Sequence, residues 1–286
     1  MEKMIPSRLT TLGHPQRLAL FRLLMRRYPD RLPAGEIAEA LGLKASTLST
    51  YLAALMQAGL VTQQRAGTSL MYSVDMSAVR QTFDYLLLDC CRGRPEICAP
   101  VSTSPCAGEA AMTGQVSNGQ KYNVLFICTG NSARSIFAEC ILRDLMPDRF
   151  NVHSAGTHPG SGMNPFAVEV LRSKGHDISD LRAKTTDEFT GPDAPRMDFV
   201  FTVCNQAANE ECPAWDGQPI SGHWGMPDPA KAEGTEAEKS LAFQQAYGAL
   251  KHRIEAFVAL PIETLDRIAL QRAVDEIASQ PQDTSQ

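Results

Sequence analysis

The sequence predicts two domains: a small, mainly helical N-terminal domain with a β-hairpin, followed by a larger C-terminal α/β domain. Its 286 residues exceed the usual single-domain size of about 150 residues. Residues 99–120 are rich in Ala, Ser, Pro and Gly and lack apolar periodicity, so we expect a linker there. After this linker, residues 122–145 have the pattern of an apolar strand, a tight loop and a helix.

The composition is that of an ordinary globular protein, with 43% hydrophobic and 21% charged residues. The chain contains no uncharged apolar run of about 18 residues, so we expect no membrane segment. Its N-terminal residues lack the apolar core of a secretion signal, which predicts a cytoplasmic protein. The eight cysteines are then expected to be reduced, and catalytic or ligand-binding roles are favoured over disulfides.

Charge is distributed unevenly between the two halves. Residues 1–100 contain 12 Lys and Arg against 8 Asp and Glu, a net charge of +4. The remaining residues contain 15 against 24, a net charge of −9, which together with +4 gives the −5 of the whole chain. A mildly basic N-terminal domain is suited to contact with nucleic acid, although small charge excesses also occur on surfaces that bind nothing.

The N-terminal domain has the pattern of a helix-turn-helix followed by a hairpin. In chain order, the predicted elements are helices over residues 13–28, 34–41 and from Ser46 onward, hairpin strands over residues 61–64 and 70–74, and a long helix over residues 77–88. Gly42 separates the second and third helices as a turn residue. Arg65 lies near the hairpin tip, where a wing contacts phosphate.

The third helix has the two faces of a recognition helix. Its apolar residues Leu48, Leu52, Leu55 and Met56 lie on one side. The other side begins with the hydroxyl residues Ser46, Thr47, Ser49 and Thr50. Recognition helices place their first polar residues against base edges in the major groove, so we predict DNA contacts there. The alternative is a small packing module whose hydroxyls face water.

Residues 13–24 (GHPQRLALFRLL) and 35–61 (GEIAEALGLKASTLSTYLAALMQAGLV), with the wing, resemble the ArsR/SmtB family of winged helix-turn-helix metalloregulators. The resemblance covers roughly residues 5–100 and implies a homodimer that represses operator DNA and releases it when a metal or metalloid binds. Many arsenic-responsive members carry a cysteine pair in the helix before the recognition helix, whereas residues 34–41 contain no cysteine.

Three thiols follow the long helix in the segment DCCRGRPEIC. Cys90, Cys91 and Cys98 resemble the C-terminal arsenite site of a subset of that family, so arsenite is the expected regulatory ligand. Three thiolates match the three-coordinate, thiophilic As(III) centre. The alternatives are incidental thiols at a helix end, or a zinc site that lacks a nearby histidine as fourth ligand. Cys106 in the linker is taken as incidental.

The C-terminal domain opens with a predicted anion cradle. The strand of residues 122–127 leads into Cys128 and the loop residues Thr129, Gly130, Asn131, Ser132 and Ala133, and then into Arg134 and Ser135 at the start of a helix. Backbone N–H groups and a helix N-terminus converge on an anion in such a loop. Arg134 offers a planar fork for two oxygens of a tetrahedral oxyanion, and Ser135 can donate a hydrogen bond to a Cys128 thiolate.

Two further landmarks follow. Asp228 stands between prolines in HWGMPDPA and is suited to protonate a leaving oxygen, although alone it would be interpreted as a turn residue. A buried strand over residues 199–203 ends at Cys204, and Cys212 follows it. A phosphatase needs one cysteine, whereas a redox cycle needs more.

The segments CTGNSARS, VCNQAANEECP and HWGMPDPA together resemble the thioredoxin-coupled arsenate reductases of the low-molecular-weight protein tyrosine phosphatase superfamily over about residues 121–260. The resemblance implies a three-layer α/β fold around a central parallel sheet. It also implies that Cys128 attacks arsenate, that Asp228 protonates the leaving water, and that Cys204 and then Cys212 take over the oxidation. Electrons then come from a thioredoxin-like reductant, with no tightly bound cofactor. Asn131 is expected to stabilise the backbone of the loop.

Two departures from the resemblance are visible. The phosphatases carry an aromatic residue after the second proline, where this chain has Ala230, which weakens the phosphotyrosine interpretation. The spacing between Cys204 and Cys212 is slightly longer than in familiar reductases. Cys140 is expected to be a buried core thiol.

We therefore predict a DNA-binding, dimerisation and arsenite-binding domain over residues 1–98, a linker over 99–120, an arsenate reductase domain over 121–278 and a tail over 279–286. Two helices, over residues 236–260 and 262–277, are expected to complete the second domain. The alternatives are a DNA-binding arsenic sensor with a catalytically silent second domain, and a protein tyrosine phosphatase.

Overall fold

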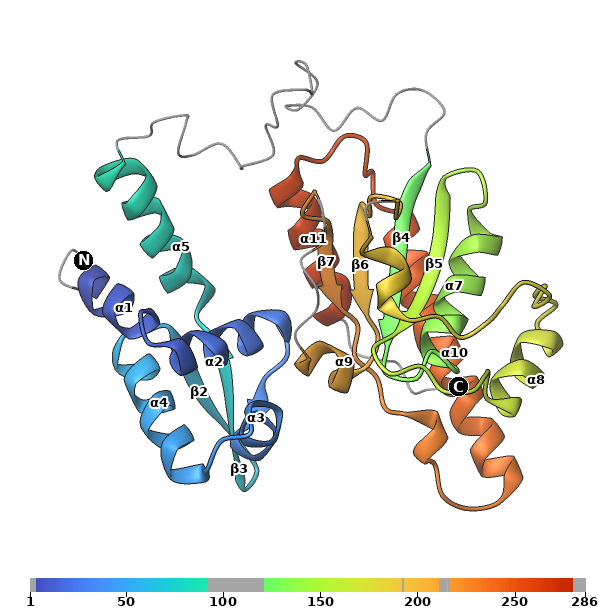
Figure 1. Ribbon diagram of the computed structural model, residues 1–286, viewed down its shortest axis with the longest axis horizontal. Coiled ribbons are helices and arrows are strands. Elements are labelled where there is room, and N and C mark those ends of the chain that lie inside the picture. Colours follow the sequence, from blue (N-terminus) through green and yellow to red (C-terminus); the bar gives the residue numbers. More distant parts are fainter. Residues whose placement is uncertain (1–3, 92–120, 192, 211–214, 216, 280–286) are drawn as a thin grey trace. The chain divides into compact units, whose positions relative to one another are not determined.

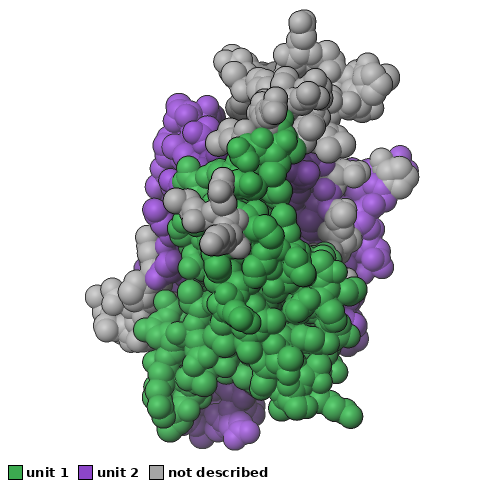
Figure 2. Space-filling model, turned by 90° about the vertical axis from the view of Figure 1, so that its left-hand side faces the viewer, with its two compact units in different colours: residues 1–110 green, residues 111–286 purple. Residues whose placement is uncertain are grey.

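The computed structural model describes residues 4–91, 121–191, 193–210, 215 and 217–279. The chain divides into two compact units, residues 1–110 and 111–286, which Figure 2 colours separately. The division falls within the predicted linker, all of which lies outside the described residues, so the linker's exact limits stay a prediction. Within the described parts of the chain, no helix is long and apolar enough to cross a membrane.

The first unit is mainly helical and ends in a hairpin and a further helix (Figure 1). Its elements are α1 Met4–Leu12, α2 Pro15–Arg26, β1 Leu32–Pro33, α3 Ala34–Leu41, α4 Ala45–Gln57, β2 Val61–Ala66, β3 Ser69–Val74, α5 Met76–Asp84 and the π-helix η1 Tyr85–Cys90. The three strands form an antiparallel sheet in the order β1-β3-β2. This agrees with the predicted helix-turn-helix and hairpin, while α1 and β1 were not predicted.

Packing in this unit follows from the apolar spacing of its helices. Leu48, Leu52 and Leu55 of α4 are at most 2% exposed and face the core. Gly42 ends α3 in the left-handed conformation with φ 61°, which glycine adopts without the steric cost of a Cβ. The turn between α3 and α4 is thereby fixed, and the hydroxyl side of α4 remains on the surface.

The predicted long helix over residues 77–88 is wrong in one respect. The α-helix α5 is capped by Asp75, whose carboxylate accepts a hydrogen bond from the Ala78 N–H at 3.0 Å, and it ends at Asp84. The chain then continues as η1, in which the Cys91 N–H reaches back five residues to the Leu86 carbonyl at 2.9 Å. Apolar spacing predicts a helix but does not separate α from π windings.

The second unit is an α/β domain. Its elements are β4 Tyr122–Cys128, α7 Arg134–Leu145, β5 Phe150–Gly156, α8 Pro165–Ser173, η2 Thr186–Phe189, β6 Phe199–Thr202, α9 Asn205–Asn209, β7 Ile220–His223, η3 Pro229–Lys231, α10 Glu236–Val258 and α11 Arg267–Ser279. The four strands are all parallel and lie in the order β5-β4-β6-β7. The predicted α/β class with a central parallel sheet is confirmed.

The parallel register brings the carboxyl ends of the strands together at one edge of the sheet. Cys128 pairs with Gly156, Ile127 pairs with Thr202, and Thr202 pairs with His223. Ligands bind at this edge in open parallel sheets. The register therefore determines which side chains meet at the site.

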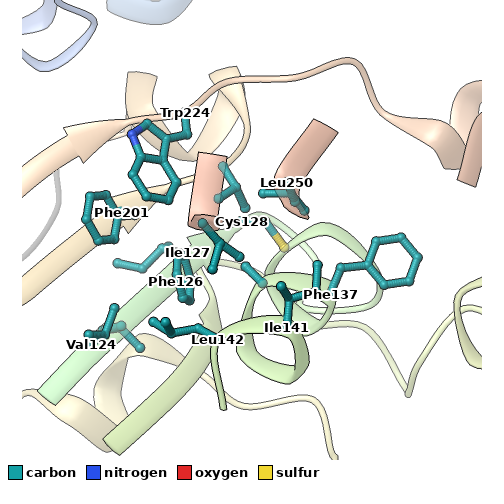
Figure 3. Packing of buried hydrophobic residues seen from close by; sticks show 14 of the residues in the cluster. Val124, Phe126, Ile127, Cys128, Phe137, Ile141, Leu142, Phe201, Trp224 and Leu250 are labelled. Atoms are coloured by element: carbon teal, nitrogen blue, oxygen red, sulfur yellow. The ribbon is translucent and has the colours of Figure 1, made fainter. Parts of the chain in front are cut away.

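An apolar core supports this edge. Residues 124–127 of β4 are fully buried, as expected for a strand covered on both faces. Phe126 stacks on Phe201 at 5.5 Å between ring centroids, and Phe201 stacks on Trp224 at 4.0 Å. Figure 3 shows these rings, with Cys128 at the end of the same strand. The strand ends that carry the site are consequently held by dense aromatic packing.

The last predicted helix begins later than expected. The sequence predicts a helix over residues 262–277, but α11 starts at Arg267. Pro261 interrupts the chain, and its carbonyl accepts hydrogen bonds from the N–H groups of Thr264 and Leu265 in a turn. Asp266 then accepts a hydrogen bond from the Ala269 N–H at 2.8 Å and so starts the helix.

Candidate functional site

Cys128 is the last residue of β4 and lies at the centre of the site. Its side chain is 3% exposed. The Asn131 N–H donates to its sulfur at 3.2 Å, and the Ser135 hydroxyl lies 2.9 Å from the same atom. Residues 129–133, the anion loop, thus curl around the thiol before α7 begins at Arg134.

The carbonyls of the anion loop are bound from outside. The carbonyls of residues 128, 129, 130 and 132 accept hydrogen bonds from the N–H groups of residues 157, 158, 160 and 164 at 2.8 to 3.1 Å. With these carbonyls bound from outside, the Asn131 N–H of the loop is directed toward the Cys128 sulfur. This is the polarity that an anion requires.

Gly156 permits this close approach. A Cβ atom at Gly156 would lie 2.7 Å from the Thr129 carbonyl oxygen and 3.0 Å from the Asn131 nitrogen. Both are backbone atoms of the anion loop and have little freedom to move. The residue is not identified by the sequence reasoning, since its contacts lie 25 or more residues away in the chain.

Asn131 holds the loop in its strained conformation, as predicted. It is fully buried and has φ 45°, in the left-handed region. Its amide donates to the Ser135 hydroxyl at 2.9 Å and to the Ser154 hydroxyl at 2.8 Å, and its carbonyl accepts from the Lys184 N–H at 2.7 Å. Hydrogen bonds to α7, to β5 and to the segment before η2 therefore fix one side chain.

A buried ion pair extends this network. The Lys184 ammonium lies 3.0 Å from the Glu139 carboxylate, and the two side chains are 10% and 11% exposed. The Ser154 hydroxyl donates to Glu139 at 2.5 Å. The sequence gives little sign of Ser154 and Lys184, because they lie outside the three recognisable segments.

Burial raises the pKa of the Cys128 thiol, which is the largest effect on this group. The Ser135 hydrogen bonds and the Arg134 charge lower the pKa, and Cys204 raises it further. The net direction is opposite to the thiolate that the sequence predicts. Ser135 and Arg134 do act as expected, but desolvation outweighs them.

Arg134 and Asp228 meet at the entrance of the anion loop. The Arg134 guanidinium lies 2.9 Å from the Asp228 carboxylate and donates to the Met226 carbonyl at 3.3 Å. The second Asp228 oxygen accepts from the Ala230 N–H at 3.1 Å. The predicted acid, Asp228, thus lies next to Arg134, although the two residues are far apart in the sequence.

Cys204 follows β6 and is 1% exposed. Its sulfur lies 3.4 Å from the Thr129 hydroxyl and accepts a hydrogen bond from the Ala207 N–H at 3.4 Å. Thr129 directly follows Cys128, so the structure brings the two predicted thiols to neighbouring strand ends. Cys212 lies outside the described residues. Cys140 is a fully buried core thiol, and burial raises its pKa to about 12.

The predicted DNA-binding residues lie on the surface of the first unit. Ser46, Ser49 and Thr50 are exposed on α4, and Thr47 is half-buried. The hydroxyls of Ser49 and Thr50 donate to carbonyls one turn earlier, at 2.9 and 3.1 Å. Arg65 is exposed in β2 one residue before its end, and its guanidinium donates to the Gly67 carbonyl at 3.2 Å.

The predicted arsenite site is described only in part. Cys90 is exposed and Cys91 is half-buried, both as free thiols, while Cys98 lies outside the described residues. Among the described side chains, no three His, Cys, Asp or Glu residues group as metal ligands. The three-thiol site therefore stays a prediction.

Comparison with known proteins assigns both units. Residues 12–64 match a family described as helix-turn-helix domain, and residues 123–270, just over half of the chain, match low molecular weight phosphotyrosine protein phosphatases. The chain belongs to the low molecular weight phosphotyrosine protein phosphatase family. It joins a domain of this family to a helix-turn-helix domain.

Relatives of the phosphatase-family domain include bacterial arsenate reductases. The arsenate reductase of Bacillus licheniformis is 41% identical over 138 residues, which are 48% of this chain and 95% of the relative. That of Bacillus subtilis is 37% identical over 134 residues, 47% of this chain and 93% of the relative. A solved arsenate reductase in an oxidized state is 28% identical, with a TM-score of 0.39, and the alignment covers 46% of this chain and 93% of the other.

Proposed function

We propose that this chain reduces arsenate to arsenite with its second unit, and that its first unit represses transcription until arsenite binds to it. The observation that carries the enzymatic half is the placement of two thiols at adjacent strand ends. Thr129 directly follows Cys128 in the chain, and its hydroxyl lies 3.4 Å from the Cys204 sulfur. A phosphatase has no use for a second thiol at this place, whereas a reductase uses it to accept the oxidation.

The first step places arsenate in the anion loop. Arg134 and the loop N–H groups bind its oxygens, and the Cys128 thiolate attacks arsenic. A sulfur–arsenic bond forms and an arsenic–oxygen bond breaks. Asp228 protonates the departing oxygen, which leaves as water. Arsenic is still pentavalent in the Cys128 adduct.

The second step transfers two electrons. The Cys204 thiolate attacks the Cys128 sulfur, and the electron pair of the sulfur–arsenic bond moves to arsenic, which leaves as trivalent arsenite. A Cys128–Cys204 disulfide remains. Cys212 then attacks Cys204, forms a Cys204–Cys212 disulfide and releases the Cys128 thiolate. Two electrons from a thioredoxin-like dithiol reduce the new disulfide.

Coupled turnover tests this proposal. Purified protein is incubated with arsenate, thioredoxin, thioredoxin reductase and NADPH, and NADPH oxidation is followed in the wild type and in Cys128→Ser, Cys204→Ala and Cys212→Ala. We expect turnover in the wild type and a loss of at least about 1,000-fold in each variant, because each thiol is a covalent participant. Cys140→Ala serves as the matched control, since that thiol is buried in the core.

Two outcomes would contradict this proposal. No wild-type turnover with any thiol reductant would favour a catalytically silent sensing domain. Hydrolysis of an aryl phosphate that survives Cys204→Ala, without arsenate turnover, would favour a phosphatase. Ala230 argues against the phosphatase, because no aromatic ring stands there to stack on a tyrosyl group.

The regulatory half rests on the first unit. The exposed hydroxyl side of α4 and Arg65 of the hairpin are proposed to contact operator DNA. Large apolar side chains exposed on α1 and α5, among them Leu9 and Phe83, support a homodimer. Cys90, Cys91 and Cys98 are the proposed arsenite ligands. A cytoplasmic location suits reduced thiols, operator DNA and a thioredoxin-like partner.

A further inference from the structure

His223 bridges the two ends of the turn that carries Cys204. It is the last residue of β7 and is 3% exposed. Its Nδ1 lies 2.8 Å from the hydroxyl of Thr202, two residues before the thiol, and its Nε2 lies 3.2 Å from the side-chain carbonyl oxygen of Asn205, directly after it. We call Thr202, His223 and Asn205 the histidine clamp.

Each nitrogen of the His223 ring has its own hydrogen-bond partner. The Asn205 oxygen is an acceptor, so Nε2 carries a proton and donates to it. Nδ1 shares a hydrogen bond with the Thr202 hydroxyl. Both ring nitrogens are thus engaged, and their partners flank Cys204 on different sides.

The chain directly after His223 is held firmly by packing and hydrogen bonds. The adjacent Trp224 is fully buried and stacks on Phe201 at 4.0 Å. Arg253 of α10 donates to the carbonyls of Trp224 and Gly225 at 2.7 and 3.2 Å. A Cβ atom at Gly225 would lie 2.4 Å from both the Asn205 oxygen and the His223 Nε2, so the chain passes in close contact with the clamp.

The element that the clamp holds is small by comparison. The helix α9 comprises only residues 205–209, and Asn205 is exposed on it. A helix this short has little stability of its own. Its position, and that of the thiol that precedes it, must come from tertiary contacts, of which the His223 bond is one.

We propose that His223 is a positioning residue for the electron-transfer step, holding Cys204 against the anion loop by gripping Thr202 and Asn205 on either side of it. The inference rests on the proposed reductase function and deepens it. In the position that the histidine clamp maintains, the Cys204 sulfur lies 3.4 Å from the Thr129 hydroxyl of the anion loop. A thiol held in this way has a high effective concentration toward Cys128.

Glutathione redox buffers measure this effective concentration without arsenate. The full-length chain carries Cys212→Ser, so that oxidation stops at the first disulfide. Each Cys128–Cys204 disulfide consumes one oxidised glutathione and releases two reduced glutathiones. Disulfide mapping by mass spectrometry gives the equilibrium ratio in this background, and in the same background with Asn205→Ala, Asn205→Asp or Gln206→Ala added.

We expect Asn205→Ala to lower the effective concentration about fivefold, the size of one lost hydrogen bond. Asn205→Asp keeps an acceptor for Nε2–H and should stay within about twofold of the parent. Gln206→Ala, on the exposed neighbour in α9, is the matched control and should leave the value unchanged. Substitution of exposed Asn205 spares the buried ring, so the fold remains intact for the comparison.

An unchanged effective concentration in Asn205→Ala overturns the proposal. Equal losses in Asn205→Ala and Asn205→Asp overturn it as well, because the accepted hydrogen bond would then not be the cause. Failure of the proposed reductase function appears separately, as a wild-type protein that does not turn over arsenate although the Cys212→Ser parent forms the disulfide in glutathione.

Discussion

At the scale of single residues, the Cys128 thiol is subject to opposing effects on its pKa. Burial raises the pKa, while the Ser135 hydrogen bonds and the Arg134 charge lower it. Since the thiolate is the nucleophile, activity should rise with pH as Cys128 loses its proton. The Ser135 hydrogen bond should therefore increase activity most at neutral pH, where a buried thiol without it would stay protonated.

Replacement of Ser135 by Ala is the direct test. Loss of the hydroxyl should raise the pKa of Cys128 further and move the rising limb of the pH profile of kcat/KM to higher pH. The value of kcat/KM at pH 7 should fall about tenfold for each pH unit by which this limb moves. Alkylation of Cys128 by iodoacetamide as a function of pH measures the same ionisation. Ser173→Ala, at the C-terminal end of α8, is the control, and coincident profiles for Ser135→Ala and the wild type would refute the assignment.

The residues recognised in advance are those that stand within short, recognisable motifs. Cys128, Arg134 and Ser135 lie within one local motif, so their type and spacing predict an anion loop. Ser154 and Gly156 act on the same loop through contacts across 23 or more residues. Spacing carries no information about such contacts, which depend on how β5 pairs with β4.

At the scale of elements, the buried ion pair links α7 to the segment before η2. Glu139 lies on α7 beneath the anion loop, and Lys184 contributes both its ammonium to Glu139 and its backbone N–H to Asn131. A Lys184 substitution removes the first contact and keeps the second. The contribution of the Lys184–Glu139 ion pair to stability can therefore be measured separately from the Lys184 backbone hydrogen bond to Asn131.

Lys184→Met should destabilise the second unit by about 3 kcal/mol, because Glu139 is left buried without its counter-charge. Adding Glu139→Gln should recover part of that loss. Both tryptophans, Trp215 and Trp224, belong to the second unit, so denaturant unfolding followed by their fluorescence reports this unit alone. A loss below about 0.5 kcal/mol would place the pair among solvent-screened ion pairs.

Elements with strong apolar periodicity are predictable from the sequence, and elements without it are not. The helix α3 has the predicted bounds, and α4 and α10 begin within one residue of prediction. The strands β5 and β7 and the helix α9 are missed, because their residues show no clear apolar period. The change from α5 to η1 is missed for a different reason, since both windings use the same apolar residues.

At the scale of the whole molecule, the product of the proposed enzyme is the ligand of the proposed repressor. A chain that makes arsenite can release its own operator when it is given arsenate. This consequence requires both domains to act and makes no assumption about how they are arranged.

Operator release in the presence of thioredoxin, thioredoxin reductase and NADPH tests that consequence. Arsenate should release the wild-type protein from its DNA but leave Cys128→Ser bound, whereas added arsenite should release both. Fluorescence anisotropy of a labelled operator fragment measures the release. Retention of wild-type protein on DNA after arsenite addition would exclude arsenite as the regulatory ligand.

The π-helix η1 has a consequence for the thiols that follow α5. A π turn is equivalent to one extra residue accommodated in an α-helix without displacing its ends. Because one residue corresponds to about 100° of rotation around an α-helix, Cys90 and Cys91 leave the helix about a quarter-turn from the azimuth that a regular helix would give them. Deletion of a single residue between Tyr85 and Asp89 would therefore restore the regular winding and leave the thiol pair in its present direction, at almost no change in length.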